Sequence, residues 1–192
     1  MQKLACGIDE VGRGALAGPL IVASVIFKDY RDIPYNIKDS KQTSMKQRKN
    51  LFRQILNNAY IGTGCVDAQM IDKVGISNAT KIAIQQSILT NICRKDLILI
   101  DGNIKLDLKY DFRSIVQGDC NYVSIAAASI VAKFIRDNIM IIKSFNHPFY
   151  KWNKNKGYGT KDHLLAIKLY GITDFHRKSY NIKVNRGYER SI

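Results

Sequence analysis

The stretch Gly7-Ile8-Asp9-Glu10-Val11-Gly12-Arg13-Gly14 decides the fold, because it joins a strand to a glycine-rich turn and places two carboxylates at the junction. Leu4 to Asp9 is predicted to form a short strand. The continuous apolar and β-branched run from Leu20 to Phe27 predicts a buried strand. The segment between them contains three glycines and a proline, which is typical of a hairpin turn. We therefore expect the sheet to begin with a hairpin.

The rest of the chain alternates predicted helices and strands. Further strands are expected at Tyr60 to Val66 and at Leu97 to Ile100. Helices are expected at Ser44 to Ala59, at Asn78 to Cys93 with one apolar stripe of Ala79, Ile82, Ala83, Leu89 and Ile92, at Ser124 to Lys143, and from a Thr160 cap to Gly171. This order predicts an α/β fold with a mixed β-sheet flanked by helices. We expect a main domain at residues 1–145 and a small C-terminal helical lobe at residues 146–192 packed on it.

The composition favours a nucleic-acid partner. The 192 residues include 30 basic and 16 acidic side chains, which gives a net charge of +14 and a pI of about 9.7. A charge excess of this size repels itself unless a polyanion neutralises it, and nucleic acid is the usual polyanion. The alternative is a basic protein with no such partner.

Cysteine and hydropathy patterns predict a cytoplasmic protein. Cys6, Cys65, Cys93 and Cys120 form no C-x-x-C pair, so we expect small buried hydrophobic side chains and neither zinc ligands nor disulfides. The apolar stretch Gly14 to Phe27 is only 14 residues long and contains Pro19, which makes it too short to span a bilayer. No secretion signal is recognised, so a cytoplasmic location follows by elimination.

Carboxylates stand where the predicted strands end. Asp9 and Glu10 adjoin the first strand, Asp101 closes the Leu97 to Ile100 strand, and Asp119 precedes the long helix. If these strands are neighbours, the carboxylates converge and need a cation to remain ionised. Oxygen ligands favour Mg²⁺ or Mn²⁺, and two such ions about 4 Å apart would clamp a phosphodiester displacement.

Each carboxylate also has a purely structural interpretation. Asp101-Gly102 alone is an ordinary turn, and Asp119 is a possible cap for the segment after it. Asp9 and Glu10 alternate along a strand, so their side chains are expected on opposite faces, and one of them would then contribute through its carbonyl or after a bulge.

Several motifs together are more specific than any one of them. They are Gly7 to Gly14, Asp39-Ser40-Lys41, Ile100-Asp101-Gly102, Gly118-Asp119, Ser124 to Lys133, Lys156 to Thr160 and His176 to Ser179. Their identity and order resemble the bacterial ribonuclease HII family from about residue 4 to residue 180. The chain departs from the family pattern at Gln42-Thr43, where Lys-Leu is common, and at Tyr180-Asn181, where Phe-Xaa is common.

The resemblance implies a ribonuclease H-like fold and an endoribonuclease that cuts the RNA strand of RNA–DNA hybrids. It also implies cutting 5′ of ribonucleotides embedded in a DNA duplex, with 3′-hydroxyl and 5′-phosphate ends. Mg²⁺ or Mn²⁺ is the implied cofactor, with two ions in the substrate complex, and a monomer is expected. The implied catalytic and metal-binding residues are Asp9, Glu10, Asp101 and Asp119. The implied substrate-binding residues are Gly12, Arg13, Gly14, Tyr158, Lys41 and Ser124.

The residue types fit these roles physically. Gly12 and Gly14 allow backbone groups to approach a ribose 2′-hydroxyl, and Arg13 can contact a phosphate, although both glycines also suit a plain turn. Tyr158, between two glycines in a lysine-rich segment, suits stacking on a sugar or base, with simple packing as the alternative.

The remaining polar candidates have weaker signals. Metal-activated water needs no histidine base, and we expect His163 to be a surface residue. The run His176-Arg177-Lys178 suits phosphate binding, while Lys133 and Arg136 are expected either in solvent or facing the substrate.

Two other functions stay open from the residues alone. One is a different nuclease or nucleotidyl transferase with the same fold, against which the pairing of Gly12-Arg13-Gly14 with Tyr158 argues. The other is a non-catalytic nucleic-acid-binding module, which would keep the basic surface and lose the carboxylates.

Overall fold

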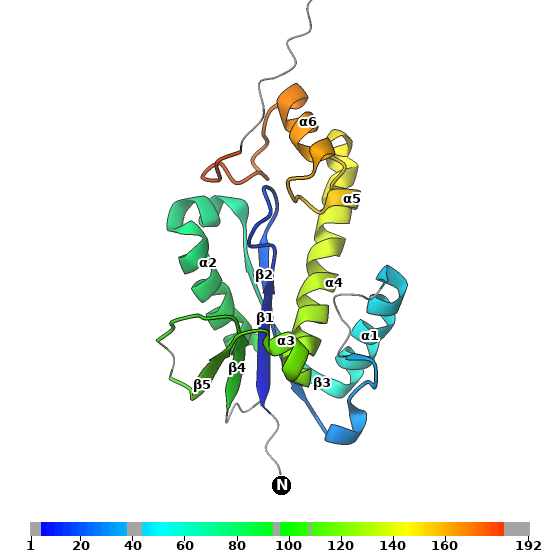
Figure 1. The fold of residues 1–192 in the computed structure, drawn as a ribbon, viewed down its shortest axis with the longest axis vertical. Helices are drawn as coiled ribbons and strands as arrows, with labels where there is room; N and C mark the ends of the chain where they lie inside the picture. The colour runs from blue at the N-terminus through cyan, green and yellow to red at the C-terminus, as the bar shows by residue number, and fades with distance from the viewer. Residues whose placement is uncertain (1–4, 38–43, 94–96, 108, 183–192) are drawn as a thin grey trace, which may run out of the picture.

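The computed structural model describes residues 5–37, 44–93, 97–107 and 109–182, and contains one five-stranded mixed sheet (Figure 1). The strands are β1 (Cys6–Val11), β2 (Leu20–Phe27), β3 (Ala59–Val66), β4 (Ile98–Asp101) and β5 (Phe112–Ile115), in the order β3-β2-β1-β4-β5. β1, β2 and β3 pair antiparallel, whereas β4 and β5 continue parallel to β1. The predicted α/β fold with a mixed sheet is confirmed.

The predicted hairpin forms between β1 and β2. Val11 pairs with Ile21, so the glycine-rich segment between them is the turn. β1 runs two residues beyond the predicted end at Asp9, and Asp9 and Glu10 therefore lie within the strand. Every residue of β2 is buried, as its continuous apolar sequence predicts, because helices cover both faces of the sheet.

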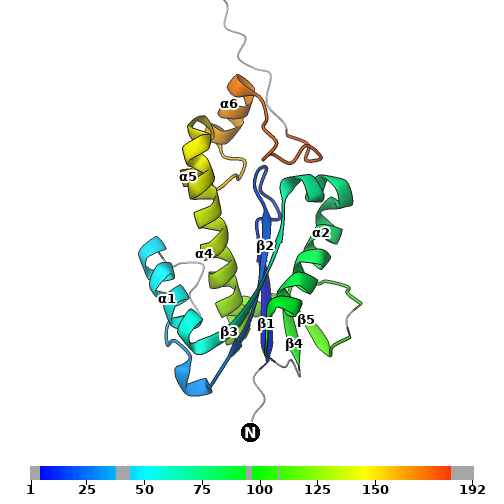
Figure 2. The ribbon, with the colours of Figure 1, turned by 180° about the vertical axis from the view of Figure 1, so that it is seen from behind.

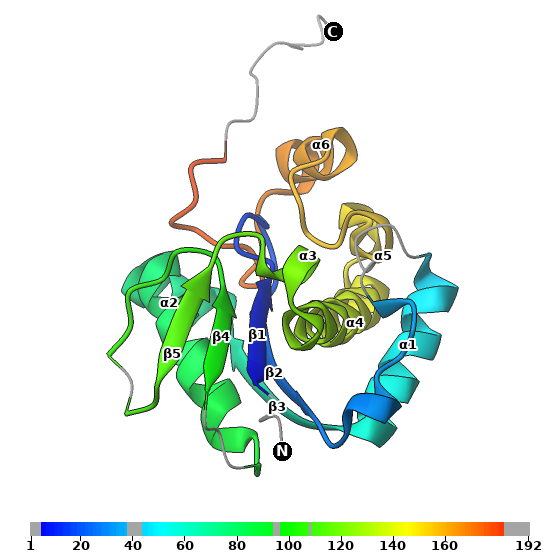
Figure 3. The same ribbon diagram turned by 60° about the horizontal axis from the view of Figure 1, so that its bottom comes forward.

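Helices cover both faces of the sheet, which gives three layers (Figures 2 and 3). α2 (Ala68–Thr90) packs on one face against side chains of β1, β2 and β4. α4 (Val123–Asn146) and α1 (Met45–Asn58) pack on the other face against the alternate side chains of β2. The smaller helical elements are η1 (Tyr30–Asp32), α3 (Gly118–Asn121), η3 (Pro148–Tyr150), α5 (Trp152–Asn155) and α6 (Lys161–Tyr170).

Capping residues account for the helix ends that the sequence predicts correctly. The Ser44 hydroxyl accepts from the Gln47 N–H at the start of α1, and the Thr160 hydroxyl accepts from the His163 N–H at the start of α6. Gly171 ends α6 with φ of 76°, a conformation that glycine adopts without strain.

The prediction for α2 is wrong at its start and on part of its buried face. The helix begins at Ala68, ten residues before the predicted start at Asn78, with Asp67 as its N-cap. The chain bends at Gly75, where φ is 77°. The kink interrupts the helical period, which hides the first segment from a periodicity argument. Leu89 and Ile92, expected on the buried stripe, are 78% and 88% exposed, and Ile84 and Ile88 are buried instead.

The chain after α4 builds a third apolar cluster at the end of the molecule where β1 and β2 turn. It consists of Ala17, Met140, Tyr150, Trp152, Ala166 and Ile167. The cluster therefore contains residues of the hairpin turn and of α4 as well as of the C-terminal segment. The expected division at residues 145 and 146 stays a prediction.

The expectation that all four cysteines are buried is wrong. Cys6 is buried in β1, Cys93 is half-buried, and Cys65 and Cys120 are exposed. Cys65 lies on the outward side of β3, whose side chains alternate between the core and solvent. Among the described residues, no helix is long and apolar enough to cross a membrane.

Two glycines give a matched test of how closely α4 packs on β1. A Cβ atom at Gly7 would lie 2.1 Å from the Ser124 carbonyl carbon, whereas one at Gly14 would meet nothing within 4 Å. We expect Gly7→Ala to lower the free energy of unfolding by roughly 2 kcal/mol or more, because the backbone of α4 has to move. Gly14→Ala should leave it unchanged or slightly raised. Urea denaturation of both variants checks this, and equal stabilities would contradict the packing described.

Candidate active site

The carboxyl ends of two neighbouring parallel strands bring Asp9 and Asp101 together. Ile8 of β1 pairs with Ile100 of β4, so the next residue on each strand stands at the same edge of the sheet. Asp9 is only 7% exposed, and Asp101 is half-buried. The condition under which these carboxylates were expected to converge, that the two strands are neighbours, is therefore met for Asp9 and Asp101.

Asp119 reaches the same edge through a tight turn after β5. Gln117 adopts a left-handed conformation with φ of 55°, and the Gly118 N–H then donates to Asp101 Oδ1 at 2.7 Å. Asp119 follows directly in α3 and is 4% exposed. The turn therefore brings the buried carboxylate of Asp119 to the edge that holds Asp9 and Asp101, because the residue before it donates to Asp101.

The electrostatics of this edge oppose full ionisation. Burial raises the pKa of Asp9 to about 7, and the charges of Glu10 and Asp101 add to the increase. Hydrogen bonds from the Ser129 hydroxyl and the Glu10 N–H partly offset it. Burial also raises the pKa of Glu10, against the lowering effect of Arg13. The protein by itself does not neutralise its own carboxylates here.

The position of one carboxylate oxygen, Glu10 Oε2, indicates where a cation would fit. Glu10 Oε2 is buried without a hydrogen-bond partner in the described part of the protein, and a buried carboxylate oxygen without a partner is unfavourable. The donors around it are carboxylate oxygens, which suit Mg²⁺ or Mn²⁺. Within the described ranges no three acidic, histidine or cysteine side chains are already arranged as a metal cage. Ligand oxygens from elsewhere, such as those of a phosphate, would have to complete the coordination.

The turn that contains Gly12, Arg13 and Gly14 lies beside this acidic edge. Arg13 Nη1 is 3.6 Å from Glu10 Oε1, and the Arg13 side chain is 44% exposed. The Arg13 carbonyl accepts from Arg177 Nη1 at 2.8 Å and from the Tyr180 hydroxyl at 2.5 Å. The backbone of the turn is thus fixed from the C-terminal segment, and the arginine side chain stays accessible.

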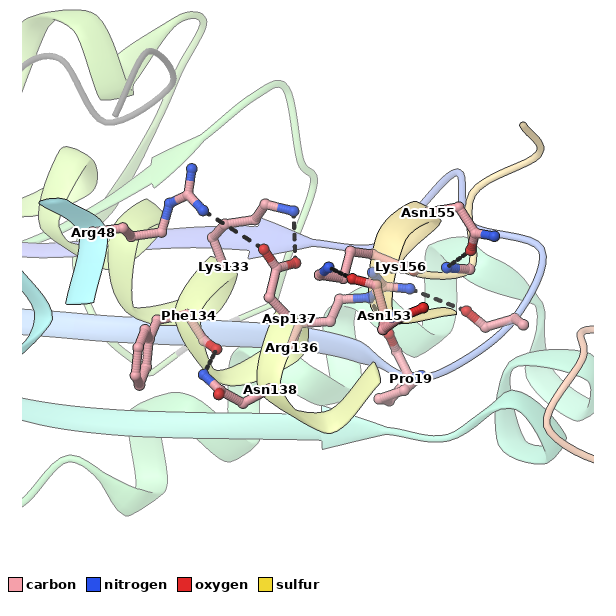
Figure 4. A network of polar contacts seen from close by, with 12 residues as sticks. Pro19, Arg48, Lys133, Phe134, Arg136, Asp137, Asn138, Asn153, Asn155 and Lys156 are labelled. Carbon is pink, nitrogen blue, oxygen red and sulfur yellow. Dashed lines mark hydrogen bonds and ion pairs between the residues drawn. The ribbon is translucent and has the colours of Figure 1, made fainter. Parts of the chain in front are cut away.

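Arg136 holds the other half of the turn from α4 (Figure 4). Its buried guanidinium donates to the carbonyls of Pro19, Ala17 and Lys156 at 2.9, 3.0 and 2.9 Å. Burial lowers its pKa to about 10, so it remains charged at neutral pH. The expectation that Arg136 is solvated or faces the substrate is wrong, because all three donor nitrogens bind backbone carbonyls. Lys133 instead pairs with Asp137 at 2.7 Å.

Gly12 is required by this packing. Its φ is 98°, and a Cβ atom there would lie 2.2 Å from Arg136 Nε. Glycine is the residue type that tolerates both the positive φ and the contact. The turn interpretation of this glycine is therefore confirmed, and its role toward substrate stays a prediction.

Tyr158 is joined to the same turn although 144 residues separate it from Gly14. The Gly157 carbonyl accepts from the N–H groups of Leu16 and Ala17 at 2.8 and 3.2 Å. The Tyr158 ring lies over the Arg136 guanidinium, with the guanidinium carbon 5.2 Å from the ring centre. Two motifs that are distant in sequence thus form one structural unit.

Two expectations for the histidines and basic residues are wrong. His163 is fully buried, because the first turn of α6 faces the apolar cluster around Trp152. His176 and Arg177, expected to bind phosphate, are buried too, and Arg177 donates to the Gly18 carbonyl as well as to that of Arg13. Lys178 is exposed and pairs with Asp174 at 3.0 Å.

The remaining predicted site residues have different outcomes. Lys41 and the unusual pair Gln42-Thr43 lie outside the described residues. Ser124 is half-buried at the start of α4, beside Gly7 on β1. The hydroxyl that contacts Asp9 belongs to Ser129, which sequence reasoning did not single out. A lone serine within an otherwise apolar helical stretch was the available signal.

Comparison with solved structures assigns the fold class. The protein resembles the enzyme in the "Structure of the PCNA:RNase HII complex from Archaeoglobus fulgidus", with a TM-score of 0.80, 23% identity and coverage of 94% of this chain and 96% of that one. It also resembles Bst-RNase HIII in complex with Mn²⁺, with a TM-score of 0.73, 19% identity and coverage of 94% and 68%. The fold is therefore ribonuclease H-like.

Sequence relatives narrow this class to one family. The family model for ribonuclease HII matches residues 6–183. Proteins named ribonuclease HII from Wolbachia pipientis wMel and from Rickettsia bellii are each 46% identical, over 94% and 91% of this chain and 91% and 88% of theirs. The chain belongs to the ribonuclease HII family, whose members are endoribonucleases acting on the RNA of RNA–DNA hybrids.

The raised pKa of Asp9 predicts that the site destabilises the metal-free protein. Between about pH 4 and pH 7, Asp9 is protonated in the folded state and already ionised in the unfolded chain. The free energy of unfolding therefore falls as the pH rises through that window. At pH 8 in chelator, Asp9→Asn should therefore be more stable than the parent, by up to a few kcal/mol, with a smaller difference at pH 5. Thermal unfolding at both pH values measures this, with exposed Asp107→Asn as the control. A variant less stable than the parent at pH 8 would contradict the assignment.

Proposed function

We propose that this protein cuts DNA duplexes 5′ of embedded ribonucleotides and hydrolyses the RNA strand of RNA–DNA hybrids, with two divalent ions at the acidic edge. The observation that supports this best is the position of the Gly12-Arg13-Gly14 turn beside the carboxylates, with Arg13 3.6 Å from Glu10. The turn proposed to recognise ribose is then adjacent to the carboxylates proposed to bind metal. Cleavage beside a ribonucleotide requires this adjacency.

Asp9, Glu10, Asp101 and Asp119 are the proposed ligands of Mg²⁺ or Mn²⁺. Glu10 Oε2 is buried without a partner within the described segments, and the pKa of Asp9 is raised; both features fit carboxylates that bind a cation. When bound, two such ions lower the pKa of an attacking water and stabilise the departing 3′-oxygen. The carboxylates hold this charge at the end of the rigid sheet, while Ser129 and the Gly118 N–H orient Asp9 and Asp101.

The substrate contacts follow from the turn and from Tyr158. Backbone groups of Gly12 and Gly14 are proposed to read the 2′-hydroxyl. Gly14 is exposed with open space beside its Cα atom, whereas Gly12 is buried against Arg136 and fixes the shape of the turn. Arg13 would bind an adjacent phosphate, and the Tyr158 ring would stack on a sugar or base of the duplex. Lys41 and Ser124 complete the proposed contact set, and the net charge of +14 favours the polyanionic substrate.

The decisive experiment is cleavage of a labelled DNA duplex that carries one ribonucleotide. We expect a cut 5′ of the ribonucleotide with Mg²⁺ or Mn²⁺, no cut in chelator, and no cut by Asp9→Asn, which should still bind the duplex. The matched all-DNA duplex is the control and should remain intact. Cleavage of long hybrids only would retain the acidic site and remove the junction-reading role of the turn. Binding in chelator with no cutting under any condition would favour a non-catalytic binding module.

The stacking role of Tyr158 has its own test. Tyr158→Ala should lower the rate of cleavage at a single ribonucleotide roughly 10- to 100-fold, because base–aromatic stacking contributes about 1–3 kcal/mol. Tyr158→Phe keeps the ring and should retain most of the rate. Single-turnover kinetics on the same duplex measure both variants. Equal rates for parent and Tyr158→Ala would rule out stacking as the function of this residue.

A further inference from the structure

A buried polar chain runs beneath Tyr158 and belongs to none of the roles assigned above. His163 Nε2 accepts from Trp152 Nε1 at 3.0 Å and lies 3.2 Å from His176 Nε2. On the other side of the ring, His163 Nδ1 lies 3.0 Å from the Tyr158 carbonyl oxygen. All three side chains are at most 1% exposed, so these contacts are shielded from water.

The partners fix the protonation of His163. An indole nitrogen can only donate, so His163 Nε2 must be the acceptor and carries no proton. A backbone carbonyl can only accept, so Nδ1 must carry the proton and donate it to Tyr158. His163 is therefore a neutral imidazole with its proton on Nδ1.

The same reasoning fixes His176 from two independent sides. His176 Nδ1 accepts from the Thr173 N–H at 2.9 Å, so the proton is on Nε2. His163 Nε2, which lacks a proton, requires a donor at the same position. The hydrogen bonds therefore run in one direction, from Thr173 through His176 and His163 to the carbonyl of Tyr158.

Adding a proton to either ring would break this direction. A proton on His163 Nε2 would face the Trp152 N–H, and one on His176 Nδ1 would face the Thr173 N–H. Burial lowers the pKa of both histidines, and that of His176 falls to about 4, with the charges of His163 and His147 as further causes. The rings packed around the chain, Tyr150 and Phe175, add no compensating carboxylate.

We propose that His163, oriented by Trp152 and His176, is a positioning residue that sets the backbone of Tyr158 and thereby the direction of its ring toward the substrate. This inference rests on the proposed stacking role of Tyr158. The Tyr158 carbonyl accepts from the Thr160 N–H as well as from His163, and its N–H donates to the Asn155 carbonyl. With the ring resting on Arg136, the residue is held from its backbone and from one face of its side chain.

The arrangement also explains why a histidine stands at position 163. A donor on one side and an acceptor on the opposite side are needed in one flat, buried side chain, and imidazole supplies both. The apolar cluster alone would accept a leucine there. The polar chain instead links α6, the segment 173–176 and the Tyr158 loop.

The protonation pattern is tested first, because it does not depend on activity. Long-range proton–nitrogen NMR spectra of the protein labelled with ¹⁵N-histidine at pH 7 should show His163 protonated on Nδ1 and His176 protonated on Nε2. His147 provides the internal reference for a histidine outside this chain of hydrogen bonds. His163 protonated on Nε2, or on both nitrogens, would overturn the proposal whatever the enzyme cuts.

Two substitutions then separate positioning from stability. In His163→Asn the amide nitrogen takes the place of Nδ1 and keeps the donor toward Tyr158. In His163→Gln the amide group reaches the place of Nε2. It can still accept from Trp152, but the donor toward the Tyr158 carbonyl is lost. We expect His163→Gln to cut at a single ribonucleotide roughly tenfold or more slowly than His163→Asn, because small displacements of a positioning group have effects of this size or larger. Leu165→Ala, on the exposed side of α6, is the control and should match the parent.

The comparison of rate with stability decides the outcome. If His163 served only the core, the rates of the two variants would follow their melting temperatures. The proposal requires the Gln variant to be slower even where it is the more stable of the two. Equal rates for the two variants would overturn the inference, provided that the parent enzyme cuts. A parent that does not cut would contradict the proposed function and leave the NMR result as the test of the hydrogen-bond chain.

Discussion

The arrangement of the candidate site depends on one buried arginine side chain, that of Arg136. Arg136 projects from α4 into a space without solvent and donates to the carbonyls of Ala17, Pro19 and Lys156. A buried guanidinium is unfavourable unless its donors are used, and here each of its three nitrogens reaches a carbonyl. Loss of Arg136 would leave those carbonyls unpaired, so the hairpin turn and the segment before Tyr158 are held together by the same side chain. This is why the two motifs that are proposed to contact substrate can occupy fixed positions relative to each other.

The acidic edge follows the opposite principle. At Arg136 the polar groups are satisfied by the protein itself. At Glu10, by contrast, a buried oxygen has no hydrogen-bond partner among the residues that the structure describes, and at Asp9 the pKa is raised to about 7. Stability is lower where such groups remain unsatisfied, and perturbed carboxylates of this kind are concentrated at functional sites. The fixed turn and the carboxylates with raised pKa are adjacent. The unfavourable burial of acidic groups is therefore located where a cation and a phosphate would offset it.

The features that sequence predicted were those encoded by local chemistry. The buried strand β2 and the Thr160 cap follow from hydropathy and capping. The pairing of β1 with β4, which brings Asp9 and Asp101 together, is a condition that the sequence leaves open. The failures share another cause. Gly75 bends α2 and interrupts its helical period. Arg136 and Arg177 are buried by carbonyls more than a hundred residues away, and His163 is buried by Tyr158, Trp152 and His176 from other turns of the C-terminal segment. A local pattern assigns such residues to the surface, because their hydrogen-bond acceptors are backbone carbonyls that the sequence does not reveal.

The structural role of the C-terminal segment follows from hydrogen bonds of the same kind. Arg177 and Tyr180 converge on the Arg13 carbonyl, and Asp72 of α2 accepts from the N–H groups of Lys178 and Ser179. The departure at Tyr180, where a phenylalanine is common in the family, thus supplies a hydroxyl that bonds to the turn beside the acidic edge. The segment therefore acts as a clamp between α2 and the turn that contains Arg13. The guanidinium of Arg177 already donates to the carbonyls of Gly18 and Arg13, so this segment fixes the position of the turn and does not present that guanidinium to a phosphate.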